Sequence, residues 1–396
     1  MSAADDLAAA AAALPGLEWA ATGPQELPPL RPPALPLGPL RRALRRARRP
    51  VLVVNDGARV TLDVLPALLA ELWEEAGQPP IVVATGTHRG DLARERDRLG
   101  GLPVELHDAD DAPAHIALDE TGRVRLDRRV ARADLVVAFG VVEPHYFAGW
   151  SGAHKTATVG VWDRATTAAN HEHALSPGSR PLVLEGNPVF DDLATAARAL
   201  EEDRRLLAVN HVLDGRGRAL AVGVGTWRGS LRRCLLASGR RYVREVPAPA
   251  DVVVARVRGP LAASLYQADK GIKNCEAAVR DGGALVLAAD CRQGVGPDRF
   301  VELLRRAPDA EAARAVVADE GYVLGDHKAV RWRALEARGV RIRVASPGLS
   351  AEALAAAGVT VDPDLASALA AVGAAAGRGL VVDDAGLVVC RPAAGA

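Results

Sequence analysis

The segment from residue 140 to residue 173 holds the densest set of side chains that could do chemistry. It reads GVVEPHYFAGWSGAHKTATVG and then, from residue 166, TTAANHEH, so that Lys155 lies between His145 and His171. A buried lysine can lose its proton and act as an amine nucleophile or covalent tether, which a guanidinium cannot do. Imidazole transfers protons near neutral pH and also binds metals. These three residues are therefore predicted to lie at the centre of a site, on a loop whose glycines let the backbone approach a ligand closely.

The histidines of this segment do not form a recognised metal site made of side chains alone. H-E-x-x-H is missing, the spacing is too scattered for a zinc finger, and HEH at 171–173 is too tight for a pair on one helical face. One imidazole plus ligands from a cofactor fits the pattern better. A purely structural role for His171, donating its N–H to a carbonyl, stays open.

Two further candidate regions follow apolar runs typical of buried strands. VLVVNDGAR (51–59) ends in Asp56 and Arg59, and a guanidinium can hold a small carboxylate through two hydrogen bonds. A structural Asp–Arg pair is the alternative. IVVATGTHR (81–89) presents Thr85, Gly86 and His88 after the strand. His88 is a candidate proton-transfer residue, although it could equally cap a helix, and no P-loop is present.

A fourth region, LYQADKGIKNCEAAV (265–279), places Gln267 and Lys270 on one helical face, where they can converge on one ligand. A solvated helix face is the alternative. Lysine is rare in this chain: 45 of the 49 basic residues are arginine, and the lysines are Lys155, Lys270, Lys273 and Lys328. Each lysine is therefore a candidate for chemistry that arginine cannot do, but the pattern assigns no role to Lys273 or Lys328.

The elements that must position these residues follow an α/β pattern. Short β-branched runs alternate with amphipathic stretches such as 62–77 and 350–358, which predicts largely parallel sheets covered by helices. The predicted strands cover 51–56, 81–86, 135–140, 251–257, 284–290, 340–346 and 359–362. Prolines near residue 247 indicate a boundary between two domains. In open α/β sheets, ligands bind beyond the carboxyl ends of the parallel strands. The predicted parts are an extended lead-in packed on the first domain (1–50), a catalytic domain (51–247), a second α/β domain (248–376) and a tail (377–396).

Composition excludes several classes of protein. The 396 residues include 49 basic and 49 acidic side chains, so no global field favours nucleic acid or an anionic membrane. No apolar run reaches the roughly 18 residues of a membrane span. The four cysteines form no C-x-x-C pair and are predicted to be reduced thiols, and the predicted location is the cytoplasm.

Taken in order, ATGTHR, EPHYFAGWSGAHK, Asn170–His171, EGNPV (185–189) and YQADK resemble the nickel-dependent lactate racemase family. The resemblance runs from about residue 50 to residue 300. It implies two α/β domains with an active-site cleft between them. It also implies nickel held by pyridinium-3-thioamide-5-thiocarboxylic acid mononucleotide, the nickel-pincer nucleotide, bound covalently to a lysine.

The resemblance also implies roles for individual residues. Lys155 would be the tether, His171 the nickel ligand, and His88 and His145 the acid/base pair. The substrate-binding residues would be Asp56, Arg59, Gln267 and Lys270, and the cofactor would be lined by Thr85, Gly86, Ser151 and Gly152. One histidine would take the hydroxyl proton of a 2-hydroxy acid while hydride moves to the pyridinium ring, and the planar keto acid would accept it back on either face. The cofactor carries the hydride chemistry and the protein supplies placement. Enzymes that make the cofactor are the implied transient partners.

The sequence departs from the family pattern beside these residues. Ala58 and Val60 flank Arg59 where the family usually has threonine and proline, GAHK replaces GGRK, and Val159 replaces a proline. The cofactor class is therefore a firmer expectation than lactate itself. Two other readings stay open: a non-catalytic protein that binds a phosphorylated small molecule, and a metal-dependent hydrolase that uses the histidines directly.

Overall fold

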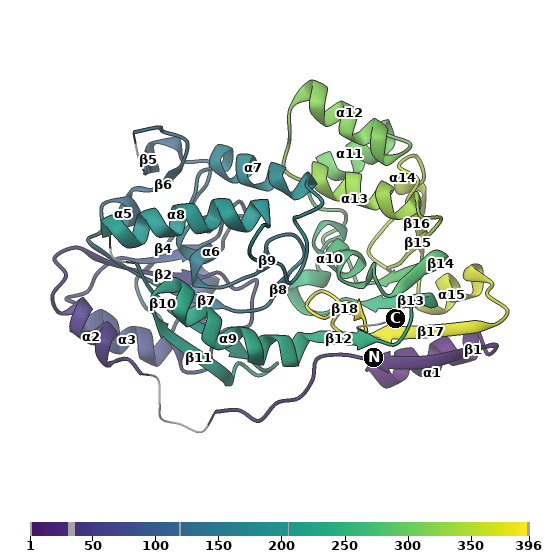
Figure 1. Cartoon of the computed structure of the whole chain (residues 1–396), viewed down its shortest axis with the longest axis horizontal. Helices are drawn as coiled ribbons and strands as arrows, with labels where there is room; N and C mark the ends of the chain where they lie inside the picture. Colours follow the sequence, from purple (N-terminus) through teal and green to yellow (C-terminus); the bar gives the residue numbers. More distant parts are fainter. Residues whose placement is uncertain (1, 31–35, 119, 205, 394–396) are drawn as a thin grey trace. The chain divides into compact units, whose positions relative to one another are not determined.

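The structure is a computed structural model that describes residues 2–30, 36–118, 120–204 and 206–393. The chain forms two compact units, each described below by itself (Figure 1). Unit 1 comprises Met1–Gln25 and Tyr242–Ala396, and unit 2 comprises Glu26–Arg241. Both contain helices and mostly parallel strands, so the predicted α/β class is confirmed. No helix in the described ranges is long and apolar enough to cross a membrane.

Unit 2 is built on a six-stranded sheet in the order β11-β10-β7-β2-β3-β4. Its strands are β2 (Pro50–Asn55), β3 (Ile81–Ala84), β4 (Val104–Leu106), β7 (Leu135–Val141), β10 (Leu206–Leu213) and β11 (Ala219–Gly225). All pairs are parallel except β10 with β11. Every residue of β7 is buried, as expected for a strand covered on both faces. Two short hairpins complete the strands: β5 (His115–Ala117) with β6 (Arg125–Asp127), and β8 (Pro144–His145) with β9 (Gly149–Trp150).

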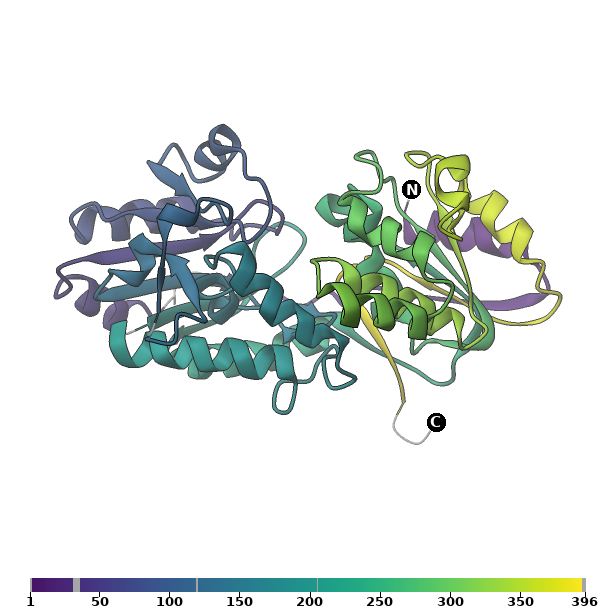
Figure 2. The same cartoon turned by 90° about the horizontal axis from the view of Figure 1, so that it is seen from above.

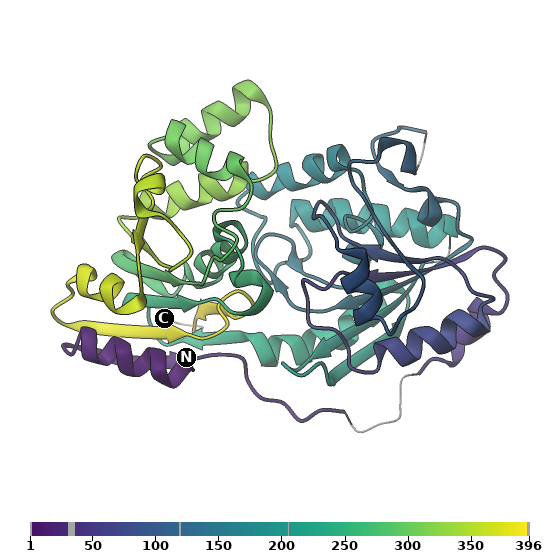
Figure 3. The same ribbon diagram turned by 180° about the vertical axis from the view of Figure 1, so that it is seen from behind.

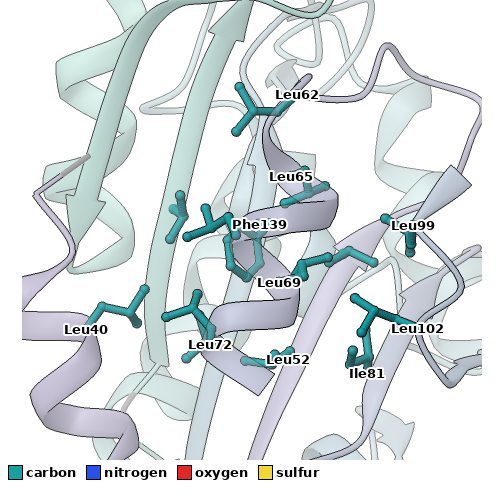
Figure 4. Close-up of a cluster of buried hydrophobic side chains, with 14 of the residues drawn as sticks. Leu40, Leu52, Leu62, Leu65, Leu69, Leu72, Ile81, Leu99, Leu102 and Phe139 are labelled. Atoms are coloured by element: carbon teal, nitrogen blue, oxygen red, sulfur yellow. The ribbon is translucent and has the colours of Figure 1, made fainter. Parts of the chain in front are cut away.

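Helices cover both faces of this sheet (Figure 2). They are α2 (Gly38–Leu44), α3 (Leu65–Glu75), α4 (Leu92–Arg98), α5 (Arg128–Ala131), α6 (Ala153–Ala157), α7 (Arg164–Glu172), α8 (Pro188–Arg204) and α9 (Trp227–Tyr242). On one face, leucines of α2 and α3 pack with Leu52 and Phe139 of the strands (Figure 4). This apolar core fixes the strands whose carboxyl ends carry the candidate site.

Unit 1 has a six-stranded, all-parallel sheet in the order β1-β17-β13-β14-β15-β16. The strands are β1 (Leu17–Thr22), β13 (Ala250–Arg256), β14 (Val279–Ala288), β15 (Arg341–Ala345), β16 (Thr360–Asp362) and β17 (Gly377–Val382), with a separate pair β12 (Val243–Val246) and β18 (Val389–Pro392). The helices are α1 (Ala3–Ala13), α10 (Leu265–Cys275), α11 (Asp298–Arg306), α12 (Ala310–Glu320), α13 (Asp326–Glu336), α14 (Ala351–Ala355) and α15 (Leu365–Val372).

The two ends of the chain differ from the extended lead-in and the tail expected from the sequence. Residues 3–13 form α1, and β1 pairs in parallel with β17, so both belong to unit 1 rather than to the first domain (Figures 1 and 3). β17 lies between β1 and β13, so part of the predicted tail forms an interior strand of the sheet. The alanine run of α1 favours helix, and the proline-rich stretch begins only after β1, so it does not disturb either element. Residues 31–35 of that stretch lie outside the described residues.

Candidate active site

Asn55, the last residue of β2, joins three of the elements around the candidate site. Its side-chain carbonyl accepts a hydrogen bond from the Val141 amide at the end of β7 (3.2 Å), and its amide donates to Thr156 Oγ1 in α6 (3.0 Å). The loop after β2 and the helix that carries Lys155 are thereby held together. Sequence reasoning did not select Asn55, although a polar residue ending an apolar strand directly before Asp56 is a visible signal.

The helix that carries Lys155 packs against β7 and β10 without room for larger side chains. A Cβ on Gly140 would lie 2.0 Å from the Ala153 nitrogen. Gly152 has a φ of +149°, which few residues other than glycine adopt. The Asn210 side-chain carbonyl, fully buried in β10, accepts the Ala153 N–H at 2.7 Å. Gly152 therefore shapes the start of α6. Asn210 was missed, and its only sequence signal is a lone amide within the apolar run LLAVNHVL.

The structure brings Lys155, His145 and His171 into one cluster around Phe147. Lys155 Nζ lies 3.0 Å from His145 Nε2 and 5.7 Å from the centre of the Phe147 ring. The Phe147 ring in turn contacts the His145 ring, with 4.6 Å between centroids, and the His171 ring, with 4.9 Å. The amine and the two imidazoles predicted from the spacing are thus neighbours in space.

Arg59 pairs with a carboxylate that the sequence reasoning did not select. Its guanidinium contacts Glu143, which is only 2% exposed and directly precedes Pro144 and His145. Ser151 Oγ donates to the Val141 carbonyl at 2.7 Å and accepts the Glu143 N–H at 2.9 Å. The Ser151 hydroxyl is thus engaged by the backbone of Val141 and Glu143. It holds in place the segment that carries both Glu143 and His145.

The loop after β3 places His88 beside Asp56. The two side chains are 3.6 Å apart (Nδ1 to Oδ2), and the His88 side chain is half exposed. The Gly86 N–H donates to the Gly160 carbonyl at 3.0 Å, which ties this loop to the end of the Lys155 segment. Thr85 is buried, and its hydroxyl donates to the His107 carbonyl at 2.7 Å. The Thr85 side chain therefore anchors the loop.

Helix α4 supports the loop that carries Asp56 and Arg59. Glu95 accepts the Gly57 N–H at 2.8 Å, and Arg98 donates to the Asn55 carbonyl at 2.7 Å and to Thr61 Oγ1 at 2.9 Å. Glu95 and Arg98 also pair with each other at 2.7 Å. This support comes from a charged segment, RERDR, that looks like an ordinary solvated helix face in the sequence.

Three buried histidines of unit 2 are held neutral. Burial lowers the pKa of His107 to about 4, with a smaller opposing effect from Asp127. Burial also lowers the pKa of His211 to about 4 and that of His154 to about 3, the latter with a further contribution from the Lys155 charge. Neither ring nitrogen of His154 has a hydrogen-bond partner. His154 stands where the family resemblance leads one to expect arginine.

In unit 1, Gln267 and Lys270 are neighbours on α10, as the helical spacing predicts, with Lys270 Nζ donating to Gln267 Oε1 at 2.8 Å. Lys328 of α13 is 1% exposed, donates to Asp269 at 3.0 Å and lies 4.6 Å from the centre of the Tyr266 ring. Lys328, which the sequence left without a role, is thus a buried partner of the helix that carries Gln267 and Lys270.

Comparison with known proteins gives a family for this arrangement. The family model for the lactate racemase N-terminal domain matches residues 35–181, and that for the lactate racemase C-terminal domain matches residues 246–322. The chain belongs to the lactate racemase family. A protein named lactate racemase from Thermoanaerobacterium thermosaccharolyticum is 30% identical over 291 residues, which cover 68% of this chain and 66% of that protein. A lactate racemase from Lactiplantibacillus plantarum is 28% identical over 281 residues, or 65% and 64%. The chain therefore spans just under two thirds of these lactate racemases.

Solved structures show the same fold. The lactate racemase apoprotein from Thermoanaerobacterium thermosaccharolyticum superimposes with a TM-score of 0.77 at 22% identity, covering 98% of this chain and 93% of that one. A structural-genomics crystal structure of a Thermotoga maritima protein gives a TM-score of 0.69 at 14% identity, covering 89% and 97%. The lactate racemase fold is thus shared along almost the whole chain.

Proposed function

We propose that the chain is an isomerase that racemises or epimerises a 2-hydroxy acid, either lactate or a relative of lactate. The observation that carries this proposal is the contact of the Lys155 amine with the His145 imidazole at 3.0 Å, in a loop tied to those of Asp56, Arg59 and His88. Membership of the lactate racemase family supports the reaction class. Ala58 and Val60, next to Arg59, differ from the family pattern, so the proposal includes 2-hydroxy acids whose side chain differs from that of lactate.

The residues present fit a nickel-pincer nucleotide. Lys155 supplies the amine that a covalent link requires, and His171 supplies an imidazole, a ligand that suits nickel. Among the described residues, no three His, Cys, Asp or Glu side chains are grouped to hold a metal ion, so His171 would need further ligands from the nucleotide. When bound, this cofactor would supply the ring carbon that accepts hydride from the substrate α-carbon.

The protein's own residues would hold the substrate and move its proton. Arg59, held by Glu143, is proposed to bind the substrate carboxylate through its remaining guanidinium donors. Gln267 and Lys270 are also proposed to contact the substrate. Asp56, whose Oδ2 lies 3.6 Å from His88 Nδ1, is proposed to orient that imidazole.

Two imidazoles suit a reaction that must serve both enantiomers. The hydroxyl of each enantiomer needs its own proton acceptor when the α-carbon keeps one position, and His88 and His145 are the proposed pair. His88 is half exposed, so a substrate can reach it. Their assignment to one enantiomer or the other is a matter for kinetics.

The test is to co-express the chain with the enzymes that make the cofactor, which are its proposed transient partners. Intact-mass measurement should show an added mass that peptide mapping places on Lys155, and the purified protein should racemise at least one acid in a panel of 2-hydroxy acids with different side chains. A chain that takes up no mass and interconverts no member of the panel would contradict the proposal. The cytoplasm is the proposed place of action, in keeping with four cysteines that are all thiols.

A further inference from the structure

A small cavity in unit 2 adjoins the candidate site. Asp56, whose carboxylate lies 3.6 Å from His88, forms part of the cavity wall. The rest of the wall comes from the loop after β2, from α3 and α4, and from the carboxyl-terminal parts of β7 and β10. Ligands of open α/β sheets bind at this edge of the sheet, so the cavity is a place where part of a substrate can lie.

The size of the cavity limits what it can accept. Val60, Leu65, Phe139 and Val141 supply apolar side chains to its wall (Leu65 and Phe139 in Figure 4). The space within is enough for about one water-sized group. A 2-hydroxy acid whose carboxylate is held by Arg59 can therefore place there one small group at the end of a short side chain, but not a ring.

The charged groups of the wall disfavour a second carboxylate. The Arg98 guanidinium is already engaged, because it donates to Glu95 at 2.7 Å and to the Asn55 carbonyl at 2.7 Å. It also donates to Thr61 Oγ1 at 2.9 Å. The Asp56 carboxylate would repel another anion at close range. A neutral substituent therefore suits the cavity better than an acidic one.

His211 of β10 gives the wall a polar group that a methyl group cannot satisfy. Burial lowers the pKa of His211 to about 4, with a smaller opposing effect from the Val209 carbonyl, so its ring is neutral at pH 7 and has one donor and one acceptor. The residue is 2% exposed, and its Nδ1 has no hydrogen-bond partner in the described part of the chain. Thr61 Oγ1 accepts from Arg98, which leaves its own proton to donate. A substrate hydroxyl can pair with both groups, whereas a methyl group leaves a buried nitrogen unpaired.

We propose that this cavity binds the substituent on the third carbon of the substrate, and that this substituent is a hydroxyl group. The preferred substrates would then be short 2,3-dihydroxy acids such as glycerate, with His211 as the residue that determines specificity and Thr61 as its second partner. This inference rests on the proposed function, which supplies the 2-hydroxy acid, and goes beyond it by selecting the side chain. Val60 lies in the cavity wall and is also a position where the sequence departs from the family pattern.

Two acids of equal length test the proposal. Glycerate carries a hydroxyl on its third carbon, and 2-hydroxybutanoate carries a methyl group in the same place. With the cofactor-loaded enzyme, we expect kcat/KM for racemisation of glycerate to be at least about tenfold higher, because a site that hydrogen-bonds a hydroxyl rejects the analogue without it. Malate, which has a carboxylate there, should also react more slowly than glycerate. An enzyme that racemises 2-hydroxybutanoate as fast as glycerate would overturn the proposal.

The variant that tests the role of the imidazole is His211→Leu, which keeps a side chain of similar size and removes both ring nitrogens. It should lower kcat/KM for glycerate by about 10- to 100-fold and leave that for 2-hydroxybutanoate unchanged or higher. The matched control is His154→Leu, which removes another buried imidazole of unit 2 and should leave the ratio of the two values unchanged. An unchanged ratio in His211→Leu would count against the proposal.

A binding measurement on the apoprotein separates this proposal from the proposed function. Nitrogen-15 NMR of the histidine-labelled full chain should show the His211 ring signals shifting with glycerate but not with 2-hydroxybutanoate at the same concentration. An equal response to both acids, or a response to neither, would overturn the proposal. A loaded enzyme that prefers 2-hydroxybutanoate would leave the racemase function in place. A chain that racemises no acid would contradict that function, while the NMR result still decides what the cavity binds.

Discussion

Two lysines of this chain, Lys155 in unit 2 and Lys328 in unit 1, lie beside different kinds of side chain. Lys328 is 1% exposed and donates a hydrogen bond to the Asp269 carboxylate at 3.0 Å, so the two form a buried ion pair. Lys155 is less buried, and its Nζ lies 3.0 Å from Nε2 of His145. The two rare lysines therefore differ in their surroundings. Lys328 lies in a buried ion pair and is a structural lysine, whereas Lys155 lies beside an imidazole and is the proposed covalent tether, a chemical lysine.

The largest expected effect follows from removing the chemical lysine. Lys155→Arg keeps a cation but has no amine nucleophile, so cofactor attachment should be lost and racemisation should fall at least about 1000-fold, or about 4 kcal/mol. Intact mass and racemisation of the loaded protein measure both. Lys273→Arg is the control, because Lys273 pairs with Glu276, the residue that follows the same helix, and has no proposed role. A Lys155→Arg protein that still takes up mass would contradict the tether.

The structural lysine should affect stability instead. Lys328→Met leaves the Asp269 carboxylate buried without a counter-charge and should lower the free energy of unfolding by about 3–5 kcal/mol. The double variant Lys328→Met/Asp269→Leu should recover most of this loss, since replacing both members of a buried pair costs little. Urea unfolding followed by tryptophan fluorescence measures each. The same Met substitution at Lys155 should change stability far less, and equal losses at the two sites would break the comparison.

Acid should weaken unit 2, because this unit holds His107, His154 and His211, whose pKa values are lowered by burial. His107, His154 and His211 bind protons in the unfolded chain below about pH 6.5 but stay neutral in the folded protein down to about pH 4 or lower. The unfolded state therefore binds more protons, and stability falls with falling pH by about 1.4 kcal/mol per unit for each histidine. Hydrogen exchange at pH 7 and pH 5 should show the loss in unit 2.

The variant that isolates one of these contributions is His154→Phe. It removes a buried imidazole whose two nitrogens have no hydrogen-bond partner, so it should flatten the pH dependence and raise stability at pH 5. His173→Phe, at an exposed site, should do neither. An unchanged slope in His154→Phe would mean that His154 is protonated in the folded protein.

The smallest effect is expected at a second ion pair, that of Arg59 with the buried Glu143. Unlike Lys328, Arg59 is partly exposed, with 24% of its side chain accessible, so loss of its partner leaves it solvated. Glu143→Gln should raise the KM for the 2-hydroxy acid about tenfold and change kcat less. A tenfold change corresponds to about 1.4 kcal/mol, close to the net free energy of one hydrogen bond to a charged group. Glu105→Gln, at an exposed carboxylate that pairs with Arg129, is the matched control. Equal KM values in the two variants would contradict a positioning role for Glu143.

Much of this molecule was predictable from local patterns. Continuous apolar runs such as VLVVN and LVVAF predict buried parallel strands, and the residues directly after them, Asp56 and His88, lie together because strand ends share one sheet edge. The ends of the chain were not predictable in this way. A six-residue strand such as β1 acquires its partner, β17, from a segment some 360 residues away, and no local pattern encodes that pairing.

The sequence by itself determined the class of fold, the family and the identity of the rare lysines, because these depend on residue types and on spacing along the chain. Only the tertiary structure decided what each lysine contacts. The contact of Lys155 with His145 depends on the hairpin that places the imidazole beside α6, and that of Lys328 depends on Asp269, 59 residues away. Composition marked four lysines as unusual, and the three-dimensional partners of two of them separate chemistry from stability.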